Sequence, residues 1–325
     1  MRFVLMGTGP FAVPTFEAVA TRCEGGGDAG DEVVAVVTRP VRGGKSRGGP
    51  PPTPVRDWSA GRDIPVWDPA SINDEASVER LRTFGADLMV VCDYGQILSD
   101  AALQSARLGG INLHGSLLPK YRGAAPVQWA VLSGDVVAGV SVLHMTPRLD
   151  GGPILATAEI EVLPTETAGE LETRLSQLGV QPTLDAIEML RQWDGQAAIG
   201  QIQSAELVTK APRLAKADGA IDWGRDAAEI DAHVRGMQPW PVAYTMFRPR
   251  ADKPPIRVAV RRVAATDRPV GDAVSGEIRV EDAVLAAAGD RWVELLEVQP
   301  AGKKPMTAME MMRGHSVPEG SRFFE

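Results

Sequence analysis

The chain has 325 residues, of which 44% are hydrophobic and 23% are charged, a composition typical of a globular protein with two domains rather than one. Its formal net charge of −8 argues against a general nucleic-acid binder. Two cysteines and four scattered histidines exclude a disulfide framework and a cysteine-based metal site. A start on the apolar run "RFVLM", with no run long enough to span a bilayer, predicts a cytoplasmic protein without a leader or a membrane anchor.

The first half of the chain alternates continuous apolar runs with helical stretches. The runs lie at residues 2–6, 32–38, 64–67, 86–92 and 109–114. Continuous runs are typical of strands buried on both faces, so this order predicts a doubly wound, mostly parallel α/β sheet. Ligands of such sheets bind beyond the carboxyl ends of the strands. That rule places four groups of residues on one rim: Gly7–Pro10, Thr38–Arg39, Asp93–Gly95 and His114.

The second half changes character near residue 205. Two more apolar runs, at 139–145 and 154–162, precede leucines and isoleucines at helical spacing between 171 and 190, which we expect to be core. Beyond the boundary, short apolar runs separated by Pro, Gly and Asp predict a small β-barrel or sandwich. These runs lie at 242–247, 256–264, 282–289 and 291–300.

The first turn, Gly7-Thr8-Gly9-Pro10-Phe11-Ala12, fits the glycine pattern of dinucleotide sites. Thr38-Arg39 stands where an acid should bind the ribose, and Pro10 removes a backbone donor. A plain strand-to-helix turn is the favoured interpretation, and an NADP site that uses Arg39 is the alternative.

Two basic segments stand out in this acidic chain. Residues 1–205 carry 16 Lys and Arg against 24 Asp and Glu, yet the loop 38–56 has five basic residues and no acid. A second cluster, at 248–262, has six basic residues and only Asp252 as an acid. One patch in each half favours contact with a phosphate backbone, and the alternative for the loop is a solvated, flexible insertion.

Asn112, His114 and Asp150 carry the predicted chemistry. Asn112 and His114 are two residues apart at a strand end, so they point to the same side. Asp150 follows the run 139–145, which we expect to lie beside the strand that ends at His114. A base beside a carboxylate, with an amide donor for an oxyanion, suits acyl transfer to an amine. A serine-hydrolase interpretation through Ser116 lacks the G-x-S-x-G elbow, and a metal interpretation lacks a second nitrogen or sulfur ligand.

The segments "INLHGSLLPKYRGAAP" (111–126) and "LDGGPIL" (149–155) resemble the signature of the folate-dependent formyltransferases. The likeness continues nearly end to end, through "ETAGELETRLSQLG", "QPWPVAY" and "LLEVQPAGKKPMTA". It implies a Rossmann-like catalytic domain (1–205) that binds 10-formyltetrahydrofolate and an OB-like barrel (206–325) that helps to hold tRNA. The implied activity is formyl transfer to the α-amino group of methionyl-initiator tRNA, by a monomer and without a metal.

The resemblance also assigns residues. Asn112, His114 and Asp150 fall on the catalytic trio of the family. The implied folate contacts are Ser116, Leu117, Leu118, Pro119, Tyr94 and Gly95. The basic insertion implies tRNA contacts at Arg39, Arg42, Lys45 and Arg47. The chain departs from the family pattern at Gly9-Pro10, in "VRGGKSRGG", and at Asp93, where alanine is usual. A nucleotide-linked amino sugar is the alternative acceptor within the family.

Overall fold

The structure is a computed structural model that describes residues 1–24, 30–41, 53–249, 254–315, 317–318 and 320–324. The chain divides into two compact units. The N-terminal unit comprises residues 1–126, 137–161 and 172–212, and the C-terminal unit comprises 127–136, 162–171 and 213–325. Among the described helices, none is both long enough and apolar enough to cross a membrane.

A seven-stranded sheet forms the centre of the N-terminal unit, in the order β3-β2-β1-β4-β5-β7-β8. Its first five strands along the chain are parallel: β1 (Arg2–Gly7), β2 (Glu32–Val37), β3 (Val66–Trp67), β4 (Leu88–Cys92) and β5 (Gly110–His114). The antiparallel strands β7 (Val137–His144) and β8 (Ile154–Glu161) extend one side. The predicted doubly wound sheet is confirmed, and the carboxyl ends of β1, β2, β4 and β5 share one edge.

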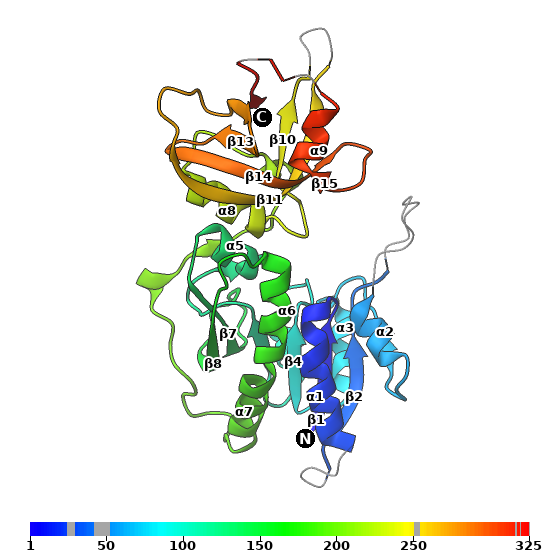
Figure 1. Ribbon diagram of the computed structural model, residues 1–325. Helices are drawn as coiled ribbons and strands as arrows, with labels where there is room; N and C mark the ends of the chain where they lie inside the picture. The colour runs from blue at the N-terminus through cyan, green and yellow to red at the C-terminus, as the bar shows by residue number, and fades with distance from the viewer. Residues whose placement is uncertain (25–29, 42–52, 250–253, 316, 319, 325) are drawn as a thin grey trace. The chain divides into compact units, whose positions relative to one another are not determined.

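Helices cover both faces of this sheet (Figure 1). They are α1 (Val13–Glu24), α2 (Pro54–Ser59), α3 (Glu75–Thr83), α4 (Asp100–Leu103), α7 (Val180–Arg191) and residues 172–178 of α6 (Ala168–Leu178). Helix α5 (Pro126–Leu132), after its first residue, and the first turn of α6 belong to the C-terminal unit. The helical spacing predicted between 171 and 190 forms two helices with a break at Gly179. A Cβ atom at Gly179 would lie 2.6 Å from Cδ2 of Leu113, so the break lets the chain approach β5 closely. Leu171 and Leu175 are fully buried, which confirms their place in the core.

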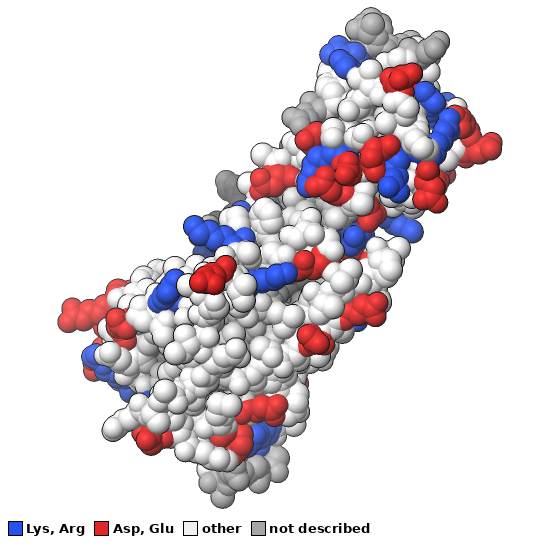
Figure 2. All heavy atoms as spheres, turned by 90° about the vertical axis from the view of Figure 1, so that its left-hand side faces the viewer, with Lys and Arg blue, Asp and Glu red and all other residues white. Residues whose placement is uncertain are grey.

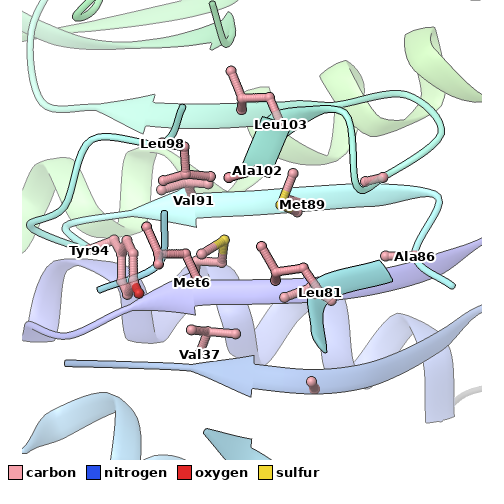
Figure 3. Close-up of a cluster of buried hydrophobic side chains, with 14 of the residues drawn as sticks. Met6, Val37, Leu81, Ala86, Met89, Val91, Tyr94, Leu98, Ala102 and Leu103 are labelled. Carbon is pink, nitrogen blue, oxygen red and sulfur yellow. The ribbon is translucent and has the colours of Figure 1, made fainter. Parts of the chain in front are cut away.

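The two faces of β1 show how the sheet is buried on both sides. Val4 and Met6 belong to a cluster on the face covered by α3 and α4, which Figure 3 shows with Leu81, Leu103 and other buried side chains. Phe3 and Leu5 alternate with them, point to the other face and are also buried. At about 25 cal/mol per Å² of buried apolar surface, two such layers supply the main stabilisation of this unit.

The C-terminal unit contains an antiparallel sheet in the order β12-β13-β14-β11-β10-β16, with β15 paired to β14. Its strands are β10 (Tyr244–Phe247), β11 (Ile256–Pro269), β12 (Ile278–Val280), β13 (Val284–Ala287), β14 (Arg291–Pro300), β15 (Met306–Thr307) and β16 (Phe323–Phe324). The long strands β11 and β14 curve strongly (Figure 1). This half-barrel confirms the OB-like β fold. Strands β10, β11, β13 and β14 follow the predicted apolar runs, whereas the short strands β12, β15 and β16 were not predicted.

Beyond residue 205, two helices were not predicted, α8 (Ala227–Gly236) and α9 (Ala308–Arg313). A capping box between Asp226 and Glu229 starts α8. Its buried Ile230 and Val234 are four residues apart, too few apolar positions to stand out in the sequence. A short two-stranded sheet in the N-terminal unit, β6 (Arg122–Gly123) with β9 (Lys210–Ala211), joins segments far apart in the chain.

Candidate active site

Strand β5 presents Asn112 and His114 at its carboxyl end. Asn112 is paired with Val91 of β4, and His114 is paired with Ser141 of β7. The expectation that the strand preceding Asp150 lies beside β5 is therefore confirmed. Leu113 packs toward Gly179, so the side chains of Asn112 and His114 point to the opposite face.

His114 and Asp150 come together at this edge. Nδ1 of His114 lies 3.9 Å from Oδ1 of Asp150, and both side chains are nearly buried, with 6% and 9% exposed. Nε2 of His114 lies 2.9 Å from the carbonyl oxygen of Tyr121. A carbonyl only accepts, so Nε2 carries the hydrogen in the neutral ring and Nδ1 keeps its lone pair on the side of Asp150. The basic nitrogen and the carboxylate thus face each other across a gap too long for a direct hydrogen bond.

The loop that carries Asp150 is held from two directions. Its backbone is left-handed at Asp150 (φ +48°), and Oδ2 accepts a hydrogen bond of 2.9 Å from the backbone of Gly123. Nε2 of Gln203 donates to the carbonyls of Asp150 (2.8 Å) and Gly152 (2.7 Å). Nε and Nη2 of Arg122 donate to Oε1 of Gln203, at 3.1 and 2.6 Å. We call this arrangement the Arg122–Gln203 clamp, and it fixes the backbone on both sides of Gly151.

The clamp and the Tyr121 carbonyl are parts of the site that the sequence did not reveal. Gln203 is 53 residues from Asp150, within a stretch without clear periodicity. Tyr121 contacts His114 through its backbone carbonyl, which every residue type has, so the residue at position 121 gives no hint of the contact. The spacing of motifs in the sequence therefore predicts neither the clamp nor the Tyr121 contact. Both arise only because the fold brings these residues to His114 and Asp150.

The turn after β5, which is predicted to receive folate, is held by two serines. Oγ of Ser116 donates to the carbonyl of Lys120 (2.7 Å). Oγ of Ser141 donates to the carbonyl of Ser116 (2.8 Å) and accepts from the backbone of Leu118 (2.9 Å). Leu118 is buried in a cluster on β7 and β8. The side chains of Ser116 and Leu118 are therefore used within the protein, while Leu117 and Pro119 are half-buried.

Tyr94, Gly95 and Arg39 also meet at the edge of the sheet. Tyr94 is 1% exposed, and burial raises the pKa of its phenol, which therefore stays protonated. Gly95 has φ +79°, and a Cβ atom there would lie 3.0 Å from Nη1 of Arg39. Arg39, predicted to contact tRNA, thus lies against the predicted folate pocket. The other residues of that prediction, Arg42, Lys45 and Arg47, fall outside the described residues.

The glycine-rich first turn does not fit a dinucleotide. A Cβ atom at Gly9 would overlap Oδ2 of Asp93, so a carboxylate lies over the turn where a pyrophosphate would approach. Two negative groups at that spot repel each other. The favoured interpretation of this turn, a plain strand-to-helix connection, agrees with this arrangement.

Charge on the face in view is mixed. Figure 2 shows basic and acidic side chains interspersed there, without a continuous basic field. In the C-terminal unit, Arg225 pairs with Glu229 (2.6 Å) and Arg268 with Glu281 (2.9 Å). Within the described ranges, no group of three or more His, Cys, Asp or Glu side chains is placed to hold a metal ion.

An α/β domain followed by an OB-like half-barrel is the organisation of the two-domain formyl-group transferases. Sequence profiles agree with this class: formyl transferase matches residues 1–187, and formyl transferase, C-terminal domain, matches residues 213–316. The chain belongs to the formyl transferase family.

Two relatives that match nearly the whole chain carry the same name. The chain is 52% identical over 326 residues to a methionyl-tRNA formyltransferase of Rhodopirellula baltica, covering 99% of this chain and 96% of the relative. It is 37% identical to one of Phenylobacterium zucineum, covering 98% and 99%.

Solved structures share the fold at low identity. WlaRD, a sugar 3N-formyl transferase, matches with a TM-score of 0.64 at 13% identity over 94% of this chain and 99% of that one. HypX from Aquifex aeolicus, solved with tetrahydrofolic acid, matches with a TM-score of 0.58 at 14% identity over 96% and 47%.

Proposed function

We propose that the protein transfers the formyl group of 10-formyltetrahydrofolate to the α-amino group of methionyl-initiator tRNA. The observation that carries the chemistry is the buried pairing of His114 Nδ1 with Asp150 at the end of β5, beside Asn112. The full-length relatives named methionyl-tRNA formyltransferase support the choice of acceptor.

The proposed reaction is an acyl transfer through a tetrahedral intermediate. The amine nitrogen forms a bond to the formyl carbon, and Nδ1 of His114 takes the proton that the amine loses. The amide of Asn112 donates to the oxygen that becomes negative. Asp150 stabilises the protonated imidazole until the carbon–N10 bond breaks and the proton passes to N10. The base and the oxyanion donor would each lower the barrier by on the order of 3 kcal/mol.

The proposed binding residues divide between the two domains. In the N-terminal domain (1–205), the turn 116–119 with Tyr94 and Gly95 would contact folate. The serine hydrogen bonds hold this turn in one conformation, which suits a ligand that is recognised partly by backbone groups. Arg39 and the basic insertion, together with the C-terminal domain (206–325), would contact tRNA. The proposal places the enzyme in the cytoplasm with translation, and one copy of the chain holds the whole His114–Asp150 pair.

The alternative acceptor is a nucleotide-linked amino sugar. The fold is shared with a sugar 3N-formyl transferase, but at 13% identity this likeness concerns the fold alone. The decisive experiment offers the purified protein 10-formyltetrahydrofolate labelled in its formyl group, with methionyl-initiator tRNA or with a nucleotide amino sugar. We expect label on the tRNA only, at a rate that His114→Ala lowers by about 10³-fold. Label on the sugar alone would overturn the proposed acceptor, and label on neither would overturn the proposed function.

A further inference from the structure

A hollow of about 310 Å³ opens on the outer face of the C-terminal sheet, apart from the His114–Asp150 site of the other unit. Three residues directly opposite one another form its floor: Tyr244 on β10, Ala259 on β11 and Gln299 on β14. The neighbours Val258, Val260 and Val298 point into the core and are buried. Because Ala259 carries only a methyl group between two longer side chains, the sheet is recessed there.

The polar wall of this C-terminal hollow is cationic. The guanidinium carbon of Arg257 lies 3.5 Å from the ring centroid of Tyr244, in stacking contact, and Lys216 lines the opening. No carboxylate lines the hollow, and within the described residues none forms an ion pair with Arg257. Arg279 provides a contrast in the same unit: it stacks on Trp292, 4.4 Å from the centroid, but is paired with Glu277 at 3.3 Å. The charge of Arg257 is thus available for an anion.

The rim of the hollow holds an aromatic side chain in solvent. Trp240 is 49% exposed, whereas Trp223 and Trp292 of the same unit are buried. Two residues later Val242 has φ +71°, a left-handed conformation that a β-branched residue rarely adopts. Its carbonyl oxygen comes so close to Gly219 that a Cβ atom there would not fit, and its amide donates to Met237 at 2.8 Å. The fold therefore maintains a strained segment that keeps the indole at the surface.

We propose that the C-terminal hollow binds one unpaired nucleotide of the tRNA, with its base stacked on Trp240 and its phosphate held by Arg257 and Lys216. An exposed aromatic ring beside unpaired cations is the combination that single-stranded nucleic acid requires, because every base has a face for stacking. The volume lies at the lower limit of ligand pockets, which suits one nucleotide and excludes a duplex. That the nucleic acid is a tRNA rests on the proposed function, whereas the class of ligand rests on the hollow itself.

Equilibrium binding of uncharged initiator tRNA, which cannot be formylated, tests the site separately from catalysis. Trp240→Ala should weaken binding about 10-fold, the loss expected for one stacked base, and Trp240→Phe, which keeps a ring, about 2-fold or less. Arg257→Ala should reduce the slope of log Kd against log salt concentration by about one. The matched control, Arg279→Ala, removes an arginine that is already paired and should bind like the wild type.

A second measurement uses the oligonucleotide rU4 as a probe of the hollow. Binding of rU4 should quench tryptophan fluorescence in the wild type, and Trp240→Phe should remove that quenching while leaving the other six of the seven tryptophans. If Trp240→Ala and Arg257→Ala bind tRNA like the wild type, or if rU4 gives no quenching, the proposal is wrong. A wild-type protein that binds rU4 at Trp240 but formylates no methionyl-tRNA would overturn the proposed function and leave this inference standing. Circular dichroism of each variant confirms that it is folded.

Discussion

The same hydrogen-bond arrangement occurs once near the candidate active site and once beside the C-terminal hollow. In the N-terminal unit, Nε and Nη2 of Arg122 donate to Gln203, which donates to the carbonyls of Asp150 and Gly152. In the C-terminal unit, Nε and Nη2 of Arg261 donate to Oε1 of Gln299 at 3.1 and 2.8 Å, and Gln299 donates to the carbonyl of Lys303 at 2.9 Å.

The two arrangements hold different kinds of structure in place. The Arg122–Gln203 clamp fixes a loop whose aspartate is buried against a histidine, where a small displacement would alter the geometry of the proposed proton transfer. The Arg261–Gln299 pair fixes a turn at the border of an exposed hollow, where a ligand can adjust to its site. In our proposals, the same Arg–Gln–carbonyl contact would therefore support catalysis in one place and binding in the other, and the two places differ in the burial of the neighbouring groups. The variants below test that distinction.

His114→Ala should have the largest effect, a loss of about 10³-fold in kcat, because it removes the proposed base. Single-turnover formylation of methionyl-tRNA measures this loss, and thermal unfolding checks that the variant is folded. His144→Ala is the matched control. His144 lies on β7 opposite Ile111 of β5, and its Nε2 is hydrogen-bonded to the carbonyl of Leu108 (2.9 Å). A similar loss in both variants would show that the effect of His114→Ala is structural.

Asp150→Asn should lower kcat by about 10²-fold, less than His114→Ala, because the amide can keep the hydrogen bond from Gly123 but cannot stabilise a protonated imidazole. Steady-state kinetics with saturating tRNA and donor separate kcat from KM. A variant with wild-type kcat would remove Asp150 from the proposed chemistry.

Gln203→Ala should lower kcat about 10-fold with little change in the KM for tRNA, because the carbonyls of Asp150 and Gly152 lose their donor and the loop moves. Gln203→Glu keeps an acceptor for Arg122 but no donor, so it should not restore kcat. Gln299→Ala, in the equivalent position of the second arrangement, should instead raise the KM for tRNA. If both glutamine variants changed the same parameter, kcat or KM, the proposed difference between the Gln203 and Gln299 arrangements would be wrong.

Glu172→Gln should have the smallest effect of these variants, and it should change the free energy of unfolding rather than kcat. Burial, and then the charge of Asp93, raise the pKa of Glu172 to about 6 from 4.5. The folded chain therefore holds this proton more tightly than the unfolded chain, and the corresponding stabilisation, complete below pH 4.5, disappears as the pH rises through 6. The variant should unfold in urea with a free energy higher by on the order of 1–2 kcal/mol at pH 8 and equal to the wild type at pH 4.

Glu170→Gln is the control of opposite sign for this measurement. Hydrogen bonds from the backbone and the hydroxyl of Thr167 lower the pKa of Glu170, so its contribution is present at neutral pH and is lost as the pH falls. At pH 8 this variant should be less stable than the wild type. A gain from both substitutions would assign the effect to removal of negative charge in general.

The sequence predicted the parts of the fold that depend on local pattern. Continuous apolar runs identified the parallel strands, and the alternation of side chains along a strand placed Asn112 and His114 on one side of β5. The neighbour of β5 was also predicted correctly, because the run 139–145 ends shortly before Asp150.

The remaining features depend on contacts between distant segments. Gln203 reaches Asp150, and Tyr244 lies in a row with Gln299, only through the fold and the strand register. The helix α8 has too few apolar positions for its period to appear. Of the basic insertion, Arg39 is described beside Gly95, and the predicted tRNA contacts at 42–47 fall outside the described residues.

The carbonyl of Tyr121 has a consequence for the path of the proton. Because it accepts from Nε2 of His114, the imidazole cannot release a proton to water through that nitrogen while the contact persists. A proton taken up at Nδ1 must then leave from Nδ1, on the side of Asp150. In the proposed reaction, the same nitrogen would therefore take the proton from the amine and pass it to N10 of the departing folate.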